Sequence, residues 1–186
     1  SQMSSNIINL LWESFLETIL MVGVSGGLGA AIGIPLGVFL FVTSPKGIMP
    51  KPYVNRIIGT VVNAVRSTPF IILLVAIIPF TRLIVGSSIG TVAAIVPLTI
   101  AAAPLIARLV ETSLREVDKG LIEAAQSMGA TNTQIICKVL IPEAMPGILA
   151  GLTIAFVALV GSSAMAGAVG GGGLGDMGIR YGYQRF

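Results

Sequence analysis

The sequence predicts an all-α membrane protein: one polytopic bundle of helices formed by residues 1–186. Its composition is 54% hydrophobic and only 10% charged, whereas soluble domains carry about 25% charged residues. The mean hydropathy is +0.95. Four long apolar runs alternate with polar links, which is the pattern of a chain that crosses a bilayer several times.

The first predicted span covers about residues 18–42 and holds no charged residue. Its 25 residues are long enough to cross about 30 Å of hydrocarbon with some tilt. Gly29, Gly33 and Gly37 form two consecutive GxxxG pairs. Such spacing predicts a smooth helix face against which another helix packs closely.

The other three spans are predicted at about residues 57–81, 91–109 and 146–169. The second is interrupted by Arg66, and Ser67 or Thr68 is expected to cap a helix whose first turn holds Pro69. The third contains Pro97 and Pro104, and the fourth is uncharged. A glycine-rich segment, residues 170–178, is expected to be extracytoplasmic or re-entrant.

The distribution of basic residues predicts the orientation in the membrane. The links after the first and third spans hold eight of the eleven basic residues: Lys46, Lys51, Arg56, Arg66, Arg108, Arg115, Lys119 and Lys138. The positive-inside rule therefore places both links in the cytoplasm and the N-terminus outside. The same rule explains the net charge of +3 without nucleic-acid binding.

Several kinds of chemistry are not expected. The chain has no histidine and one cysteine, Cys137, which excludes an internal disulfide, a His/Cys metal cluster and a Ser–His or Cys–His nucleophile. No segment fits the phosphate-binding pattern G-x-x-x-x-G-K-[ST], so ATP hydrolysis is not expected here. Gly170, Gly172 and Gly175 match G-x-G-x-x-G, but no strand precedes them, and a dinucleotide site is rejected.

The link at about residues 118–142 predicts two short helices outside the hydrocarbon. Asp118 is a candidate N-cap, Gly129 a candidate stop, and Thr131 with Gln134 has the form of a capping box. The apolar positions of the first helix are Leu121, Ile122, Ala125 and Met128. A hairpin resting on lipid is one interpretation, but the polar face has Lys138 as its only base, which favours a protein partner.

These residues resemble the EAA loop of ATP-binding-cassette importer permeases. The matching pattern is Glu123-Ala124-Ala125, three residues, Gly129, nine residues, then Val139-Leu140-Ile141-Pro142; Val139 and Ile141 replace the family's usual Ile and Leu. The stretches VRSTPFIILLVAIIPFTRLIVGSSIG, AAIVPLTIAAAPLIARLVE and SSAMAGAVGGGGLGDMG resemble the branch that imports D- and L-methionine.

The resemblance implies the type I importer fold, with a fifth span expected after Phe186. It implies a homodimer in the bacterial inner membrane, two copies of a separate ATPase subunit that hold ATP and Mg, and an extracytoplasmic substrate-binding protein. No cofactor and no enzymatic activity are implied for this chain. The residues expected to couple to the ATPase are Glu123, Ala124, Ala125, Gly129 and Pro142.

The residues along the route of the cargo are less clearly indicated by the sequence than the coupling residues are. The fourth span contains a patch of small residues that includes Ser162 and Ser163, both candidates for the pathway, and Met165, a candidate gate. Pro97 of the third span is a further candidate for the pathway. Tight helix packing is the alternative role for all four residues.

Other cargoes, such as another amino acid or an osmolyte, stay open. An ion-coupled secondary transporter is disfavoured because no ionisable residue lies deep in a span. A non-transporting membrane adaptor is a further alternative, and the EAA spacing argues against it.

Overall fold

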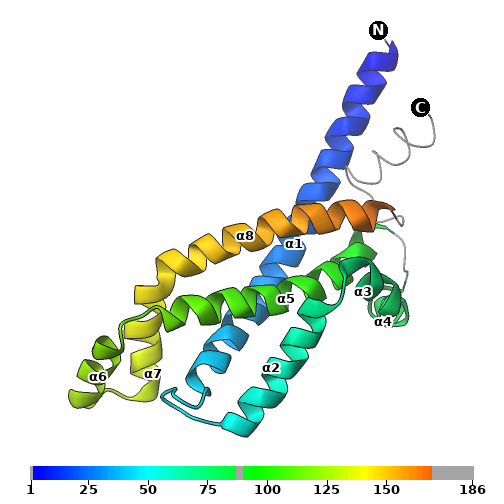
Figure 1. The fold of residues 1–186 in the computed structure, drawn as a ribbon. Helices are drawn as coiled ribbons and strands as arrows, with labels where there is room; N and C mark the ends of the chain where they lie inside the picture. The colour runs from blue at the N-terminus through cyan, green and yellow to red at the C-terminus, as the bar shows by residue number, and fades with distance from the viewer. Residues whose placement is uncertain (1, 87–89, 169–186) are drawn as a thin grey trace.

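The computed structural model describes residues 2–86 and 90–168, which are almost entirely helical. The helices are α1 (Gln2–Val42), α2 (Pro52–Ser67), α3 (Phe70–Ala76), α4 (Ile78–Val85), α5 (Thr91–Arg115), α6 (Lys119–Ser127), α7 (Asn132–Ile135), the π-helical turn η1 (Ile136–Leu140) and α8 (Ile141–Ala168). Figure 1 shows α5 and α8 side by side with α1 crossing behind them, and α6 and α7 at the end of the molecule opposite the N-terminus.

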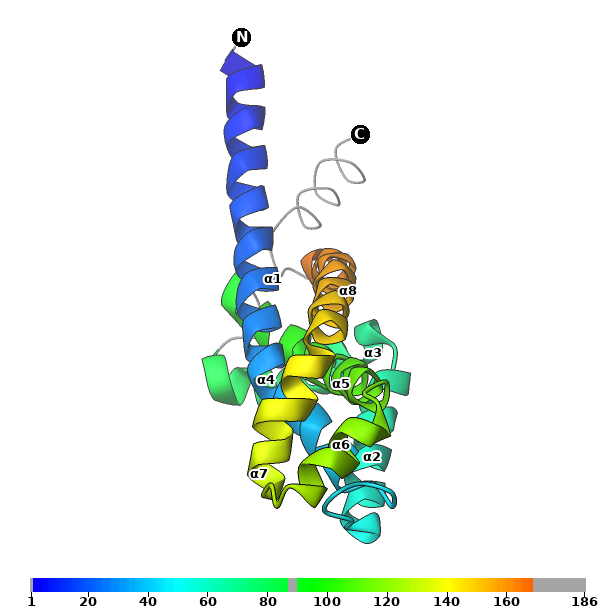
Figure 2. The same cartoon turned by 90° about the vertical axis from the view of Figure 1, so that its left-hand side faces the viewer.

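Helix α5 is the centre of the packing. It has most of its contacts with α1 and many with α8, and Figure 2 shows α1 on one side of α5 and α8 above it. The core consists of apolar side chains from all three helices, among them Met21, Leu98, Ile106, Leu114 and Leu159. Much of the outer surface of the helices remains apolar, including Trp12, Ile32 and Val157. This distribution suits a helical bundle whose surroundings are lipid.

Three of the described helical stretches are long and apolar enough to cross a membrane: Gln2–Val42, Thr91–Arg115 and Asn132–Gly167. Each extends beyond the span that hydropathy alone predicts. Helix α1 begins 16 residues before the predicted start at Thr18, and its 41 residues measure about 60 Å, about twice the hydrocarbon thickness. Hydropathy marks the apolar part of a helix, whereas hydrogen bonding continues into its polar ends.

The second predicted span, residues 57–81, is not one straight helix. Helices α2 and α3 meet at an angle of 105°, so this pair is a broken span or a re-entrant loop. Pro69 lacks an N–H and restricts Thr68, which is extended with ψ 124°. The expected cap was wrong: Pro69 itself is the N-cap of α3 and no side chain caps it. The Thr68 hydroxyl instead donates to the carbonyl of Ala64, at the end of α2.

The connection from α1 to α2 is held by polar contacts. The side-chain amide of Asn55 donates to the carbonyl of Leu40 at 2.7 Å and to the hydroxyl of Thr43 at 3.1 Å. The Thr43 hydroxyl donates to the carbonyl of Phe39 at 2.6 Å. The Asn55 amide thus supplies a donor to a carbonyl in the last turn of α1, whereas the carbonyl of Phe39 also accepts from the N–H of Thr43. These polar contacts fix the start of α2 against the end of α1.

Candidate functional site

The candidate site is built on α6, which begins immediately after the long helix α5 ends. Asp118 caps α6, and its Oδ1 accepts a hydrogen bond of 2.9 Å from the N–H of Gly120. None of the residues of α6 is fully buried. A helix of nine residues is marginal in isolation, so its caps and its contacts with the rest of the chain hold it in place.

Gly129 ends α6 in a left-handed conformation with φ of 79°. The N–H of Gly129 donates to the carbonyl of Gln126, and the N–H of Ala130 donates to the carbonyl of Ala125, both at 3.0 Å. This pair of bonds is the Schellman arrangement, which satisfies the last carbonyls of a helix. Glycine adopts the required φ without the steric cost that a Cβ adds. The turn therefore fixes the angle at which the chain leaves α6.

The two sides of α6 differ in what they contact. Ile122 and Ala125 are half-buried and pack against the core cluster of the chain. Leu121 and Met128 were expected on the same apolar face, but they point outward, and Met128 is 87% exposed. Glu123 and Ala124 are also exposed. An outward face with Leu121, Ala124 and Met128 at helical spacing is therefore covered by none of the described residues.

Helix α7 has the capping box expected from the sequence. The Thr131 hydroxyl accepts from the N–H of Gln134 at 3.2 Å, and the Gln134 side chain accepts from the N–H of Thr131 at 2.9 Å. Ile135 and Leu140 are buried and anchor this second part of the link in the core.

Pro142, the last of the coupling residues expected from the sequence, does not separate two helices. Helix α7, η1 and α8 follow one another without a gap, and Pro142 is the exposed second residue of α8. Proline removes a donor and clashes with the carbonyl four residues earlier in a regular α-helix. Directly before it, the N–H of Ile141 donates to the carbonyl of Ile136, a wider i to i−5 turn. The π turn accommodates Pro142 while the helix continues, and Figure 1 shows that the helix changes direction in this region.

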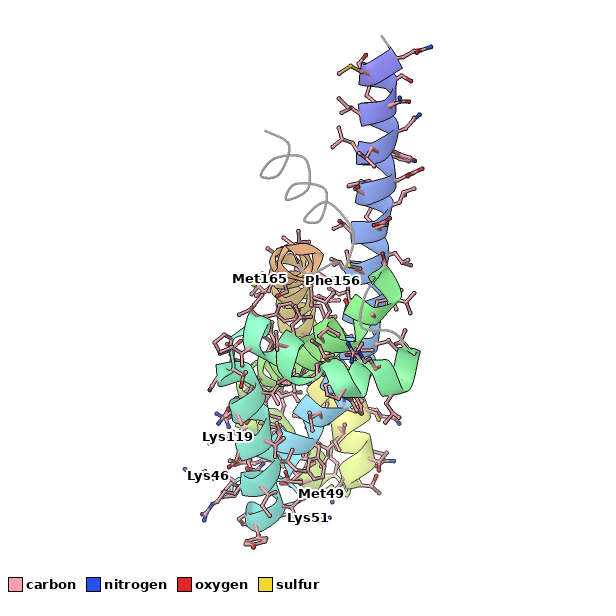
Figure 3. All side chains as sticks on the ribbon, turned by 90° about the vertical axis from the view of Figure 1, so that its right-hand side faces the viewer. Lys46, Met49, Lys51, Lys119, Phe156 and Met165 are labelled. Atoms are coloured by element: carbon pink, nitrogen blue, oxygen red, sulfur yellow. The ribbon has the colours of Figure 1, made fainter. Side chains whose placement is uncertain are left out.

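A cleft of 620 Å³ lies between α6 and the connection from α1 to α2. Glu123 and Gln126 line it from α6, and Lys46 lines it from the connection. Lys119 is a further lining residue, and Figure 3 shows Lys46 and Lys119 on the same side of the molecule. Glu123 therefore lines a cleft that two lysines, Lys46 and Lys119, also line.

Sequence reasoning missed a cluster of charged residues at the end of α5. Glu111 is only 4% exposed, and its two oxygens bind Arg108 and Arg115 at 2.6 Å each. Arg108 also donates to the carbonyl of Gly59 and to the side chain of Asn63, both at 3.0 Å. Burying a carboxylate is unfavourable unless it is paired and hydrogen-bonded, as Glu111 is. The signal in the sequence was the i, i+3 and i, i+4 spacing of opposite charges.

The glycines of α1 lie where α5 crosses it. A Cβ on Gly29 would come within 2.7 Å of the Cβ of Ala102, and one on Gly37 within 2.8 Å of the Cβ of Val110. Gly33 makes an equally close approach to Ile106. The face that these glycines form is occupied by α5 of the same chain.

The proposed pathway residues do not share one surface within this chain. Ser163 is buried, and its hydroxyl donates to the carbonyl of Val160 at 2.7 Å. Ser162 is half-buried, and Pro97 is fully buried within α5. Met165 points outward and is 49% exposed; Figure 3 shows it near the end of α8, on the same helix as Phe156. The glycine-rich segment, residues 170–178, lies outside the described residues.

Comparisons with known proteins agree with this architecture. Residues 33–185 match the family described as "Binding-protein-dependent transport system inner membrane component". The chain is 58% identical over 178 residues to the "Probable D-methionine transport system permease protein MetI" of Vibrio cholerae, covering 96% of this chain and 79% of the relative. It is 55% identical to the "D-methionine transport system permease protein MetI" of Escherichia coli K12, covering 89% and 76%.

A solved structure described as "Inward facing conformations of the MetNI methionine ABC transporter" superposes with a TM-score of 0.94. The sequences are 55% identical, and the match covers 96% of this chain and 83% of that chain.

Proposed function

The chain belongs to the family of binding-protein-dependent transport system inner membrane components, and from this premise we propose that it is the membrane-spanning permease of an ATP-driven importer of D- and L-methionine. The likeness to the methionine permeases of Vibrio cholerae and Escherichia coli supports the choice of cargo. The permease is a transport subunit. ATP and Mg bind to a separate ATPase, of which two copies serve two copies of this chain.

The observation that carries the mechanism is the uncovered face of α6. Leu121, Ala124 and Met128 present apolar atoms outward, and the exposed Glu123 lines the cleft on a different side of α6. An amphipathic helix of this kind is suited to the groove of a partner protein. We assign that partner as the ATPase and place α6 on the cytoplasmic side, as the positive-inside rule requires. The N-terminus then lies outside the cell.

The contacts of α6 make it suited to transmit force. Asp118 caps its start, the Gly129 turn fixes its exit, and Ile122 and Ala125 hold its inner face on the core. When the two ATPase subunits bind ATP and close, they move α6, and the helices change between inward- and outward-open arrangements. ATP drives this change because it favours the closed form of the ATPase, and only such differential affinity shifts the equilibrium. We assign the arrangement described above to the inward-open state, which its superposition on the inward-facing structure supports.

The cargo crosses near the centre of the dimer. The described spans carry no charged side chain at their middle, so a zwitterionic amino acid meets neutral dipoles there. Binding at such a site is weak, and an external binding protein supplies the affinity. We retain Met165 as a candidate gate because its side chain is 49% exposed and is therefore accessible to a second copy of the chain. Ser162 is the adjoining candidate for the pathway.

The test is uptake into proteoliposomes that contain this chain, the ATPase and the binding protein. Radiolabelled methionine is expected to accumulate only when ATP and the binding protein are both present. Liposomes that contain the ATPase alone are the control. Uptake of another solute, with none of methionine, would overturn the assigned cargo; failure to retain any ATPase would overturn the assigned class of transporter.

A further inference from the structure

Arg108 joins α5 to α2, and these two helices make few other contacts with each other. From α5, its Nη1 donates to the carboxylate of Glu111, while its Nη2 donates to the carbonyl of Gly59 and to Oδ1 of Asn63 in α2. A guanidinium holds its donors in a rigid planar fork, so one side chain can bind a carboxylate and a neighbouring helix at the same time. Lysine carries a single charged centre and lacks this geometry.

Asn55 attaches the N-terminal end of α2 to the end of α1, and Arg108 attaches the middle of α2 to α5. Of its 16 residues, Gly59 and Val62 are buried, and both lie near Arg108 along α2. A Cβ on Gly59 would come within 3.3 Å of Nη2 of Arg108, so the guanidinium lies directly against the α2 backbone. At its C-terminal end α2 meets α3 at an angle of 105°, across the break at Pro69. A break of this kind transmits bending poorly, because no helical hydrogen bonds continue through it.

The other end of the charged cluster lies next to α6. Arg115 is the last residue of α5, and it pairs with the same carboxylate of Glu111. Its side chain lines the cleft that Glu123 and Ile122 of α6 also line. The cluster therefore extends from the edge of α6 to the backbone of α2 along the final turns of α5.

We propose that Arg108 is a positioning residue that makes α2 and the C-terminal part of α5 move as one body, so that displacement of α6 reaches α2. The inference rests on the proposed function, because it assumes that α6 is driven by an ATPase. The break at Pro69 is then the place where this body moves relative to α3. Arg115 pairs with Glu111 at the α6 end of the cluster but does not reach α2, so it has no part in the contact between α5 and α2.

The first experiment compares Arg108→Met with Arg115→Met in the complete transporter with its ATPase and binding protein. Each change removes one cation from Glu111 and leaves the other in place, but only Arg108→Met severs the contacts with α2. Methionine transported per ATP hydrolysed is expected to fall about 3- to 30-fold in Arg108→Met and to stay within about twofold of wild type in Arg115→Met. The amount of methionine transported per ATP hydrolysed by Arg108→Lys is expected to lie between the values of Arg108→Met and wild type. Equal ratios for Arg108→Met and Arg115→Met would overturn the proposal.

The second experiment measures the motion directly. In a Cys137→Ser background, spin labels are placed on the exposed residues Tyr53 of α2, Thr112 of α5 and Ile72 of α3, in one copy of the chain per complex. The Tyr53–Thr112 distance is expected to be the same with and without trapped ATP, while the Tyr53–Ile72 distance changes. In Arg108→Met the Tyr53–Thr112 distribution is expected to broaden. A state-dependent Tyr53–Thr112 distance in the wild-type protein would overturn the proposal.

The outcomes separate this inference from the assigned function. A wild-type complex that neither retains an ATPase nor takes up methionine contradicts the assigned function. If the wild-type complex transports methionine but Arg108→Met leaves the distribution of Tyr53–Thr112 distances unchanged, only the positioning role is contradicted. If Arg108→Met fails to assemble, Asn63→Leu is used instead. It removes the hydrogen bond between Arg108 and Asn63 of α2 and leaves the Arg108–Glu111 ion pair intact. Asn63→Leu is also expected to lower the amount of methionine transported per ATP hydrolysed.

Discussion

Gly33 of α1 and Ile106 of α5 meet with no room between them. A Cβ on Gly33 would lie 2.9 Å from the Cβ of Ile106 and 2.7 Å from the carbonyl oxygen of Ala103. Both distances are shorter than ordinary van der Waals contacts, so the α1 backbone rests directly on α5. The crossing of these two helices fixes where the end of α5, and hence α6, lies.

Adding a methyl group at Gly33 is therefore expected to destabilise the fold. Gly33→Ala forces Ile106 and the α5 backbone to move, and overpacking of this kind costs about 1–3 kcal/mol. Gly27→Ala is the matched control, because Gly27 lies on α1 and nothing lies within 4 Å of the position that its added methyl group would take. Thermal unfolding of the detergent-solubilised chain measures the difference. An equal midpoint for the two variants would contradict the close contact.

Reversing the charge at Glu123 is expected to weaken binding of the ATPase. Glu123 is exposed on α6, so Glu123→Lys is expected to leave the fold of this chain intact while it reverses a charge on the helix assigned to the partner. Loss of a charged contact at an interface costs about 2–5 kcal/mol when the pair is buried on binding. The measurement is the amount of ATPase that co-purifies with the permease. Glu116→Lys, an exposed glutamate outside α6, is the control and should retain wild-type association.

Met128 offers an independent test of the same face. Because Met128 is 87% exposed, Met128→Asp removes almost no contact within the chain and should leave the unfolding midpoint unchanged. If the ATPase covers this side chain, association should weaken by about 1.5–3 kcal/mol, the value of burying a side chain of this size. Met3→Asp, also exposed but at the opposite end of the molecule, serves as control. Wild-type binding by Met128→Asp would remove Met128 from the interface.

The turn at Gly129 should tolerate substitutions in a defined order. With φ of 79°, a side chain at this position is strained, by about 1–2 kcal/mol for ordinary residues and less for asparagine. Stability and ATPase coupling are expected to decrease from wild type through Gly129→Asn and Gly129→Ala to Gly129→Val. Hydrogen exchange at the end of α6, measured together with ATP turnover, reports both effects. The reverse order of Asn and Val would show that the left-handed turn does not govern this segment.

The local features of the link were predictable because they depend on neighbours in sequence. Asp118 caps α6, Gly129 ends it, and Thr131 with Gln134 forms the capping box, each within a few residues. The division of α6 into inner and outer faces was not predictable. Ile122 and Leu121 are equally apolar, and only the position of the core decides that the first is covered and the second exposed.

Two prolines of this chain have different effects on their helices. The cap expected at Ser67 or Thr68, with Pro69 in the first turn, was read from residue type alone and is wrong. Pro69 sharply bends its segment, whereas Pro142 lies in a continuous helix beside a π turn. The local rule says that proline disturbs a helix, but surrounding packing determines whether the helix breaks or adapts.

By itself, the sequence determined that this protein is a helical membrane bundle and which ends of its short helices are capped, and it supplied the proposal that residues 118–142 contact a partner. Those properties follow from transfer free energy and from hydrogen bonds between close residues. Only the tertiary structure decided that Gly33 rests on Ile106, that Glu111 is buried between two arginines, and that Arg108 reaches α2. Arg108 and Gly59 are 49 residues apart, and contacts at such separation depend on how the whole chain packs.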